Sequence, residues 1–297
     1  MKPGASTQFN AVGSDTITHF YNIKNNTMNS FKHLIITRFM CDNFLKKDVT
    51  NVNPLSNKWK EMAFDVAKRH IIPTLENQNN QNFTLVFLVG SNCNDEDIQR
   101  IYNLSDKLDI DICYLQYFKE YIENIETDYL ITSRLDYDDH VFKYCVNYIQ
   151  NYFLEKEPEV CIIGLGEGIS LVDGELECHL CYNFDWLVNE GCPAPMTTLI
   201  LKRTAVWNYF DIYKLGFHTE VVKNLLAVQS YYLKNPTYNV YTLYHHKKGF
   251  DIDYIWLRHK HSATYLVDGT IHNTNIIVQL SEEELRNNFG YITGSKP

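Results

Sequence analysis

Three carboxylates stand within four positions of this chain, at Asp136, Asp138 and Asp139. They follow an apolar run that begins at Tyr129, and such a run predicts a buried strand. Acidic side chains at the end of a buried strand are unstable without a cation or a basic partner. Mg²⁺ and Mn²⁺ prefer oxygen ligands, and Mg²⁺ is commonly held by one or two carboxylates together with substrate phosphates. The stretch therefore predicts a site for Mg²⁺ or Mn²⁺.

In an extended segment Asp136 and Asp138 would point the same way, so that one binds the metal and the other meets a ribose or sugar hydroxyl. Arg134, on the same side, would offset negative charge and pair with a phosphate or carboxylate; the alternative is a structural salt bridge. An exposed acidic turn is the alternative for the whole stretch. An EF-hand is excluded, because the positions that need Gly and Glu hold Val141 and Asn147.

Basic and imidazole side chains gather far along the chain, at residues 245–248 and 256–262. In an acidic chain they would form a positive patch suited to a diphosphate, with Lys248 and Arg258 among its members. Imidazole is an acceptable Mn²⁺ ligand, so His261 or His259 would complete the metal shell that Asp138 begins. The alternative is a solvated basic loop.

Alternating strands and helices would position these groups. Apolar runs and helical periodicity predict strands at 33–39, 83–89, 110–115 and in the acidic stretch, and helices at 57–78, 95–108 and 118–125. This alternation predicts an α/β fold with an open, mostly parallel sheet and helices on both faces. Ligands bind beyond the carboxyl ends of such strands, where Arg38, Ser91 and Asp136 would converge.

The second half of the chain has a mixed α+β pattern. The expected strands are 160–163, 169–172, 176–182, 197–201 and 240–244, and the expected helices are 141–152, 205–213, 220–233 and 281–290, the last with a Ser281–Glu284 capping box. Residues 1–30 are polar and predict a tail or a loosely docked arm. We expect residues 31–297 to form one domain with two functional halves, 31–155 and 156–297.

Composition excludes several classes of protein. The formal net charge of −9 argues against a general nucleic-acid binder. No apolar run approaches the ~18 residues of a membrane span, and eight scattered cysteines suggest buried thiols, so we expect a cytoplasmic protein. The glycines at 164–168 do not fit a dinucleotide fingerprint, because a hairpin rather than a helix should follow. One Cys-x-x-Cys pair, at 178–181, is too few ligands for a closed zinc site.

Taken together, the chain resembles a GT-A glycosyltransferase, in which an Asp-x-Asp motif after a central strand binds a divalent metal and a sugar nucleotide. More narrowly, it resembles a family of rhamnosyltransferases with that fold. The resemblance lies in Ile36–Phe39, Pro73–Gln78 with Asn82-Phe83, Ser133–Asp139 and Trp256–Ser262. It departs where GT-A enzymes often place an acidic residue to hold the nucleobase: this chain has Gly90-Ser91-Asn92, with Asp95 as a possible substitute.

The resemblance implies a metal-dependent transferase that moves a sugar, rhamnose or another hexose, from a nucleoside diphosphate donor to a glycan hydroxyl with inversion. Its site would include Arg38, Ser91, Asp95, Arg134, Asp136, Lys248 and Arg258 for the nucleotide, and Asp136, Asp138, Asp139 and His261 for Mn²⁺ or Mg²⁺. Residues 31–155 would hold the nucleotide sugar and 156–297 the acceptor. Such an enzyme works in the cytoplasm or at the membrane surface where glycans are assembled.

An inverting reaction needs a general base near the acceptor hydroxyl. Glu220 is the first choice by position and Asp211 the second. The alternative for Glu220 is a first-turn carboxylate that complements the helix dipole. Two other functions stay open: a nucleotide-sugar hydrolase, and a non-catalytic module that binds a nucleotide sugar or a glycan.

Overall fold

The computed structural model describes the backbone and side chains of residues 30–41, 56–165, 195–204, 211–213 and 280–290. It also describes the backbone of residues 167–172, 177–182, 214–215, 239–243, 254–258 and 273–279.

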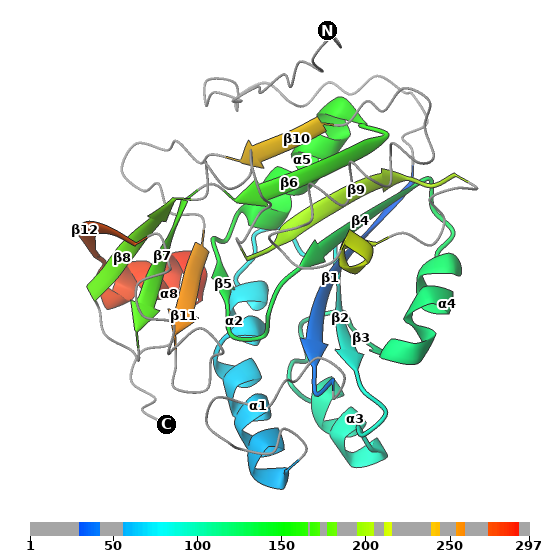
Figure 1. Ribbon diagram of the computed structural model, residues 1–297, viewed down its shortest axis with the longest axis horizontal. Coiled ribbons are helices and arrows are strands. Elements are labelled where there is room, and N and C mark those ends of the chain that lie inside the picture. The colour runs from blue at the N-terminus through cyan, green and yellow to red at the C-terminus, as the bar shows by residue number, and fades with distance from the viewer. Residues whose placement is uncertain are drawn as a thin grey trace, which may run out of the picture.

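The larger sheet has seven described strands in the order β10-β6-β9-β4-β1-β2-β3 (Figure 1). Their bounds are β1 Phe31–Phe39, β2 Thr84–Val89, β3 Ile110–Tyr114, β4 Tyr129–Arg134, β6 Val160–Leu165, β9 Thr197–Lys202 and β10 Asn239–Leu243. Strands β4, β1, β2 and β3 pair in parallel, and so do β10 and β6, whereas β9 is antiparallel to both of its neighbours. The expected open, mostly parallel α/β sheet is confirmed.

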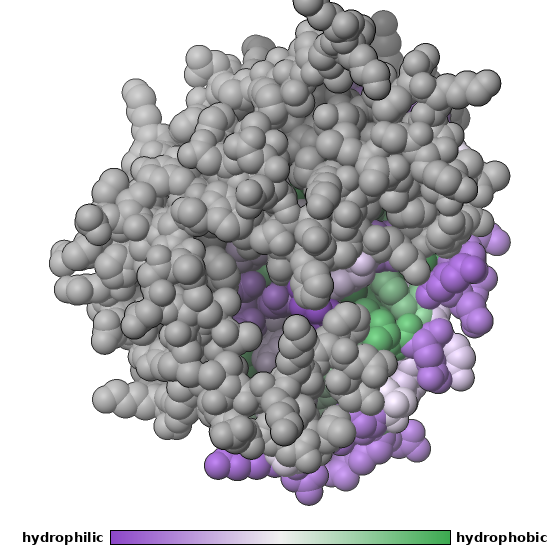
Figure 2. Space-filling view, in the orientation of Figure 1, coloured by the Kyte–Doolittle hydropathy of each residue, from purple (hydrophilic) through white to green (hydrophobic). Residues whose placement is uncertain are grey.

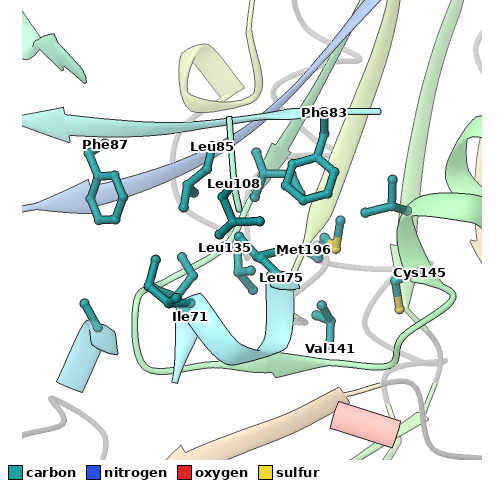
Figure 3. Packing of buried hydrophobic residues seen from close by; sticks show 14 of the residues in the cluster. Ile71, Leu75, Phe83, Leu85, Phe87, Leu108, Leu135, Val141, Cys145 and Met196 are labelled. Atoms are coloured by element: carbon teal, nitrogen blue, oxygen red, sulfur yellow. The ribbon is translucent and has the colours of Figure 1, made fainter. Parts of the chain in front are cut away.

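Helices cover both faces of this sheet. They are α1 Asn57–Arg69, α2 Ile71–Glu76, α3 Asp95–Tyr102, α4 Phe118–Glu123, α5 Cys145–Lys156 and the short 3₁₀ turns η2 Leu115–Tyr117 and η3 Ile212–Leu215. Side chains alternate along β1, so Ile35 packs with α1, α2 and α5, whereas Ile36 packs with α4 and η3. Figure 3 shows the first of these cores, where Ile71 and Leu75 of α2 pack near Leu85. The alternation explains why strands buried on both faces read as continuous apolar runs.

The strand order has a switch point between β1 and β4. From β1 the chain moves outward to β2 and β3, then returns to the other side of β1 as β4 (Figure 1). At such a point the connections leave in opposite directions, which opens a crevice at the carboxyl ends of the two strands.

A second sheet, with described strands in the order β12-β8-β7-β11-β5, lies beside the first (Figure 1). Its strands are β5 His140–Val141, β7 Glu167–Val172, β8 Glu177–Tyr182, β11 Tyr254–Arg258 and β12 Asn273–Gln279, and the helix α8 Glu282–Phe289 follows. Strand β5 comes directly after the acidic stretch and pairs antiparallel with β11, which places Ile255 opposite His140. Distant parts of the sequence therefore meet next to the carboxylates.

The structure differs from the sequence predictions in several places. The helix expected at 57–78 breaks at His70, because Pro73 has no N–H to continue the ladder and instead lies in the first turn of α2. Helix α3 ends at Tyr102, since the Ser105 hydroxyl accepts the N–H groups of Lys107 and Leu108 and forms a turn. Val141 belongs to β5, not to a helix. Strands β11 and β12 were not expected.

Other predictions are confirmed or fall outside the described residues. Helix α8 begins with the predicted Ser281–Glu284 capping box. Cys41, Cys93, Cys113, Cys145 and Cys161 are buried thiols, as expected. Within the ranges that the structure describes, no helix is long and apolar enough to cross a bilayer. The expected tail at 1–29 and helix at 220–233 lie outside the described residues, as does the first part of the helix expected at 205–213.

Candidate active site

Two arginines meet at the switch point, Arg38 from β1 and Arg134 at the end of β4. The guanidinium carbons lie 5.6 and 5.0 Å from the centroid of the Tyr213 ring, within the range of a cation–π contact. The Tyr213 hydroxyl donates a hydrogen bond to the carbonyl oxygen of Ile36 at 3.1 Å, and burial raises its pKa, which keeps it protonated. One ring from η3 therefore positions both cations.

Asp136 faces both arginines. Its Oδ1 lies 3.7 Å from Arg38 Nη2 and 3.8 Å from Arg134 Nε. At these distances the groups form ion pairs but are too far apart for hydrogen bonds. Two guanidinium groups therefore lie beside the first carboxylate of the acidic stretch, and such cations suit an anionic ligand.

Arg134 is the more buried of the two arginines, with a side chain that is only 4% exposed. Its Nε has no hydrogen-bond partner among the described residues. A buried charged donor without a partner is costly and rare, and such groups often indicate an absent ligand, ion or water. A phosphate oxygen could satisfy this donor, because guanidinium and phosphate match in geometry.

The acidic residues form a tight turn. The Asp139 N–H donates to the Asp136 carbonyl oxygen at 3.2 Å, so the segment is not extended as the sequence analysis expected. The prediction that strand alternation places Asp136 and Asp138 on one side is therefore wrong. The turn brings the carboxylates together instead. Burial raises the pKa of Asp139 well above its usual value, and the charges of Asp138 and Asp136 raise it further, whereas Arg134 lowers it.

These carboxylates fit a divalent cation in part. Asp139 is buried, and in the described part of the chain its Oδ1 finds no hydrogen-bond donor. Asp136 and Asp138 are half-buried beside it. Across the described residues, no three His, Cys, Asp or Glu side chains are placed to share one metal ion. The turn could therefore supply only part of a coordination shell, which is how Mg²⁺ is commonly held when waters and phosphates complete it.

Figure 2 shows this face of the molecule as a surface. Hydrophilic atoms of described residues are visible in the region where β4 ends in Figure 1, and a hydrophobic patch of described residues lies next to them.

The other candidate residues differ in what the structure says of them. Ser91 and Asp95 are exposed in the loop after β2 and in the first turn of α3, at the same edge of the sheet. That loop is tied to the end of β1 by a hydrogen bond from Gly90 N–H to the Met40 carbonyl oxygen, 3.3 Å. The structure brings them to the edge, and no described contact joins them to the arginine cluster.

Asp211 lies close to the arginine cluster but is 1% exposed. Its Oδ1 accepts the Tyr213 N–H at 2.7 Å, which shapes the turn that carries the Tyr213 ring. The adjacent Ile212 N–H donates to the Thr132 hydroxyl of β4 at 2.9 Å. These bonds anchor η3 on the sheet, so Asp211 in this arrangement orients Tyr213.

The remaining candidates come from the second half of the chain. Glu220, Lys248 and His261 lie outside the described residues, and only the backbone of Arg258 is described, in β11. Because β11 is antiparallel to β5, its chain continues from the Ile255–His140 pair in the direction of the acidic turn.

Tyr213 was missed by the sequence analysis. It was placed inside an expected helix at 205–213, and a single tyrosine in an aromatic-rich chain gives no signal of its own. Only the packing of η3 against β4 shows that this ring contacts both arginines.

Comparisons with known proteins give remote similarities. No family model matches this chain, and no curated protein matches it. Among solved structures, "S. aureus TarS 1-349 in complex with UDP-GlcNAc" has a TM-score of 0.40 and 14% identity over 76% of this chain, which spans 58% of that one. HddC from Yersinia pseudotuberculosis complexed with GMP-PN has a TM-score of 0.36 and 14% sequence identity. The match covers 75% of this chain and 93% of HddC. Mouse xyloside xylosyltransferase 1 in its apo form has a TM-score of 0.36 and 10% sequence identity. The match covers 72% of this chain and 85% of that one.

Proposed function

We propose that this chain is a metal-dependent glycosyltransferase that moves a sugar from a nucleoside diphosphate donor to a hydroxyl group of a glycan, with inversion at the sugar carbon. One observation carries the proposal. At the switch point, a buried guanidinium whose Nε makes no hydrogen bond and a buried carboxylate whose Oδ1 makes none lie on the same short stretch, at Arg134 and Asp139, in the described structure. A diphosphate with a bound cation would satisfy both groups.

The candidate residues have separate roles in this proposal. Asp138, with Asp136 or Asp139, and His261 would hold Mn²⁺ or Mg²⁺, which when bound stabilises charge on the leaving diphosphate. Arg134 donates hydrogen bonds to a phosphate oxygen from a site that excludes water, where such bonds are strong. Tyr213 keeps the guanidinium in place.

The nucleoside would extend from the diphosphate along the edge of the sheet. Arg38, at the end of β1 and partly exposed, would contact the nucleotide, with Ser91 and Asp95 beyond it. Lys248 and Arg258 would add positive charge on the diphosphate. The two guanidinium groups at this site support an anionic donor.

The general base remains the Glu220 carboxylate in this proposal. Asp211, the second candidate, is buried and accepts a backbone N–H, so it favours a structural role. Glu220→Gln should abolish transfer and leave donor binding intact, because the amide cannot accept the acceptor proton. Asp211→Asn is the matched variant, and turnover unchanged in Glu220→Gln would remove Glu220 from this role.

A panel of nucleoside diphosphate sugars, incubated with Mn²⁺, tests the reaction. Release of nucleoside diphosphate only when a glycan acceptor is present would support the transferase. Release without an acceptor would indicate a nucleotide-sugar hydrolase, and saturable binding without turnover would indicate a binding module. Either of these results would overturn the proposal.

A further inference from the structure

His140, the residue that directly follows the acidic turn, joins three segments of the chain. It is fully buried. Its Nδ1 lies 3.2 Å from the carbonyl oxygen of Phe289 at the end of α8, and its Nε2 lies 3.0 Å from Nδ1 of His70, at the junction of α1 and α2. The two imidazole rings are nearly perpendicular, at 85° with centroids 5.2 Å apart. One side chain therefore connects β5, α8 and the α1–α2 junction.

The direction of these hydrogen bonds follows from the groups involved. A carbonyl oxygen only accepts, so His140 Nδ1 carries the proton that is donated to Phe289. A neutral imidazole that carries its proton on Nδ1 has an acceptor at Nε2. His70 Nδ1–H is then the donor to His140. Each nitrogen of the His140 ring is thus matched to a partner of the opposite kind.

Helix α8 is held against the same region by several further contacts. The Lys143 N–H donates to the Asn288 carbonyl oxygen at 2.9 Å, and the Phe142 and Phe289 rings pack 5.9 Å apart. The helix ends at Gly290 with φ +67°, where an added Cβ would lie 2.3 Å from the carbonyl oxygen of Pro73. Only glycine permits this close approach of α8 to α2.

Strand β5 is also fixed from the side of α2. The Thr74 hydroxyl accepts the Val141 N–H and donates to the Val141 carbonyl oxygen, both at 3.0 Å. The chain that leaves the acidic turn is therefore held by α2 on one side and by the end of α8 on the other. The acidic turn leads directly into this region, because the hydrogen bond from Asp139 N–H to the Asp136 carbonyl oxygen closes the turn and His140 is the next residue.

We propose that His140 is a positioning residue for the acidic turn: by joining the α1–α2 junction to the end of α8, it fixes the carboxylates of Asp138 and Asp139, and docking of the C-terminal helix thereby sets their affinity for a divalent cation. This inference rests on the proposed function, since it assigns the turn to a metal. It adds two elements, His70 and α8, that do not contact the ion.

The experiment compares the two buried histidines of the protein's described part, His140 and His33. His33 is 2% exposed and bonds to Ser133 and Gln150, which lie outside the acidic turn. His140→Leu and His33→Leu each remove two hydrogen bonds from a buried site. Titration with Mn²⁺ alone, followed by calorimetry, gives the affinity, and hydrogen exchange gives the protection of the Asp139 amide.

We expect both variants to melt at lower temperature, but only His140→Leu to weaken Mn²⁺ binding, by about 10- to 100-fold, the range found for residues that orient metal ligands. It should also speed exchange of the Asp139 amide. His140→Asn, whose amide nitrogen can still donate to the Phe289 carbonyl oxygen, should lose less Mn²⁺ affinity than His140→Leu. Unchanged affinity and exchange in His140→Leu, or equal changes in His33→Leu, would overturn the inference.

Two further outcomes remain decisive. If the wild-type chain binds no Mn²⁺, the proposed metal site fails, and exchange of the Asp139 amide alone decides whether His140 positions the turn. If His140→Leu does not fold, Gly290→Ala replaces it, because the added Cβ displaces α8 from Pro73 and leaves His140 in place. Gly290→Ala should then speed Asp139 exchange, and full protection in this variant would contradict the role of α8.

Discussion

Two neighbouring residues of β4, Ser133 and Arg134, face opposite sides of the sheet and belong to buried polar clusters of different kinds. The cluster around Ser133 forms a complete chain of hydrogen bonds. The cluster around Arg134 contains charged atoms with no hydrogen-bond partner among the described residues. Because native proteins rarely leave buried polar groups unsatisfied, the first cluster indicates structure and the second indicates a ligand.

The chain around Ser133 can be followed bond by bond. The Gln150 amide donates to the Asn82 carbonyl oxygen at 2.6 Å and to His33 Nδ1 at 3.1 Å. His33 Nε2–H donates to Ser133 Oγ at 2.8 Å, and Ser133 Oγ lies 2.6 Å from Thr198 Oγ1. The Thr198 hydroxyl donates to a backbone carbonyl at 3.0 Å. The chain joins α5, β1, β4 and β9, which accounts for its burial.

The largest expected effect is on the side of the unsatisfied cluster. Asp138→Asn removes a proposed metal ligand, so transfer in the presence of Mn²⁺ should fall by about 10²-fold or more, the cost of losing one electrostatic contact to the leaving group. Rates at varied Mn²⁺ concentration measure this. Asp106→Asn, at an exposed carboxylate, is the control. Full activity in Asp138→Asn would exclude Asp138 as a ligand.

The satisfied cluster should respond in stability instead. Gln150→Leu leaves His33 Nδ1 and the Asn82 carbonyl oxygen without their donor, at roughly 1–3 kcal/mol for each buried group, so we expect a loss of about 2 kcal/mol or more. Urea denaturation gives the free energy of unfolding. Affinity for nucleoside diphosphates should stay the same. A weaker nucleotide affinity at unchanged stability would mean that this cluster serves the site.

The pH dependence of stability provides a second check on the satisfied cluster. Burial lowers the pKa of His33 to about 3, against 6.5 in an unfolded chain. Between these values only the unfolded state binds the proton, so stability falls as pH drops from about 6.5 towards 3, by about 1.4 kcal/mol per pH unit for this residue. His33→Gln should flatten that part of the stability profile. Parallel profiles for the two proteins between pH 6.5 and 4 would contradict a neutral, buried His33.

Arg134→Met tests whether the unsatisfied guanidinium is a ligand contact or a structural salt bridge. If Arg134 binds phosphate, the affinity for nucleoside diphosphate should fall about tenfold, while stability changes little, because its Nε makes no hydrogen bond and its ion pair with Asp136 is 3.8 Å long. Calorimetric titration and urea denaturation measure the two quantities. Arg100→Met, at an exposed pair with Glu61, is the control. Loss of several kcal/mol with unchanged affinity would favour the salt bridge.

Much of the sheet could be predicted from the sequence, because β1 to β4 are short β-branched runs whose pattern is local. The meeting of Arg38 and Asp136 followed from strand alternation, since parallel strands end at one edge. The contacts of Tyr213 and the docking of α8 could not be predicted. Tyr213 contacts an arginine of β4 that lies far away in the sequence. Phe289, whose carbonyl oxygen accepts a hydrogen bond from His140, lies 149 positions after it. Such contacts leave no periodic signal.

The conformation of residues Asp136–Asp139 was predicted wrongly for a different reason. The carboxylates were expected to share a side through strand alternation, but the strand ends at Arg134 and the chain folds back through a hydrogen bond from Asp139 to Asp136. A run of acidic residues does not distinguish an extended end from a turn, because Asp favours both loops and turns.

Binding of nucleoside diphosphates in the presence and absence of Mn²⁺, measured by calorimetry, tests the central claim most directly. The account predicts that at least one of them binds saturably, that binding requires Mn²⁺, and that it is lost in Asp138→Asn and weakened in Arg134→Met but retained in Gln150→Leu. Equal binding by all four proteins, or no binding by the wild-type chain, would contradict the assignment of the unsatisfied cluster as the ligand site.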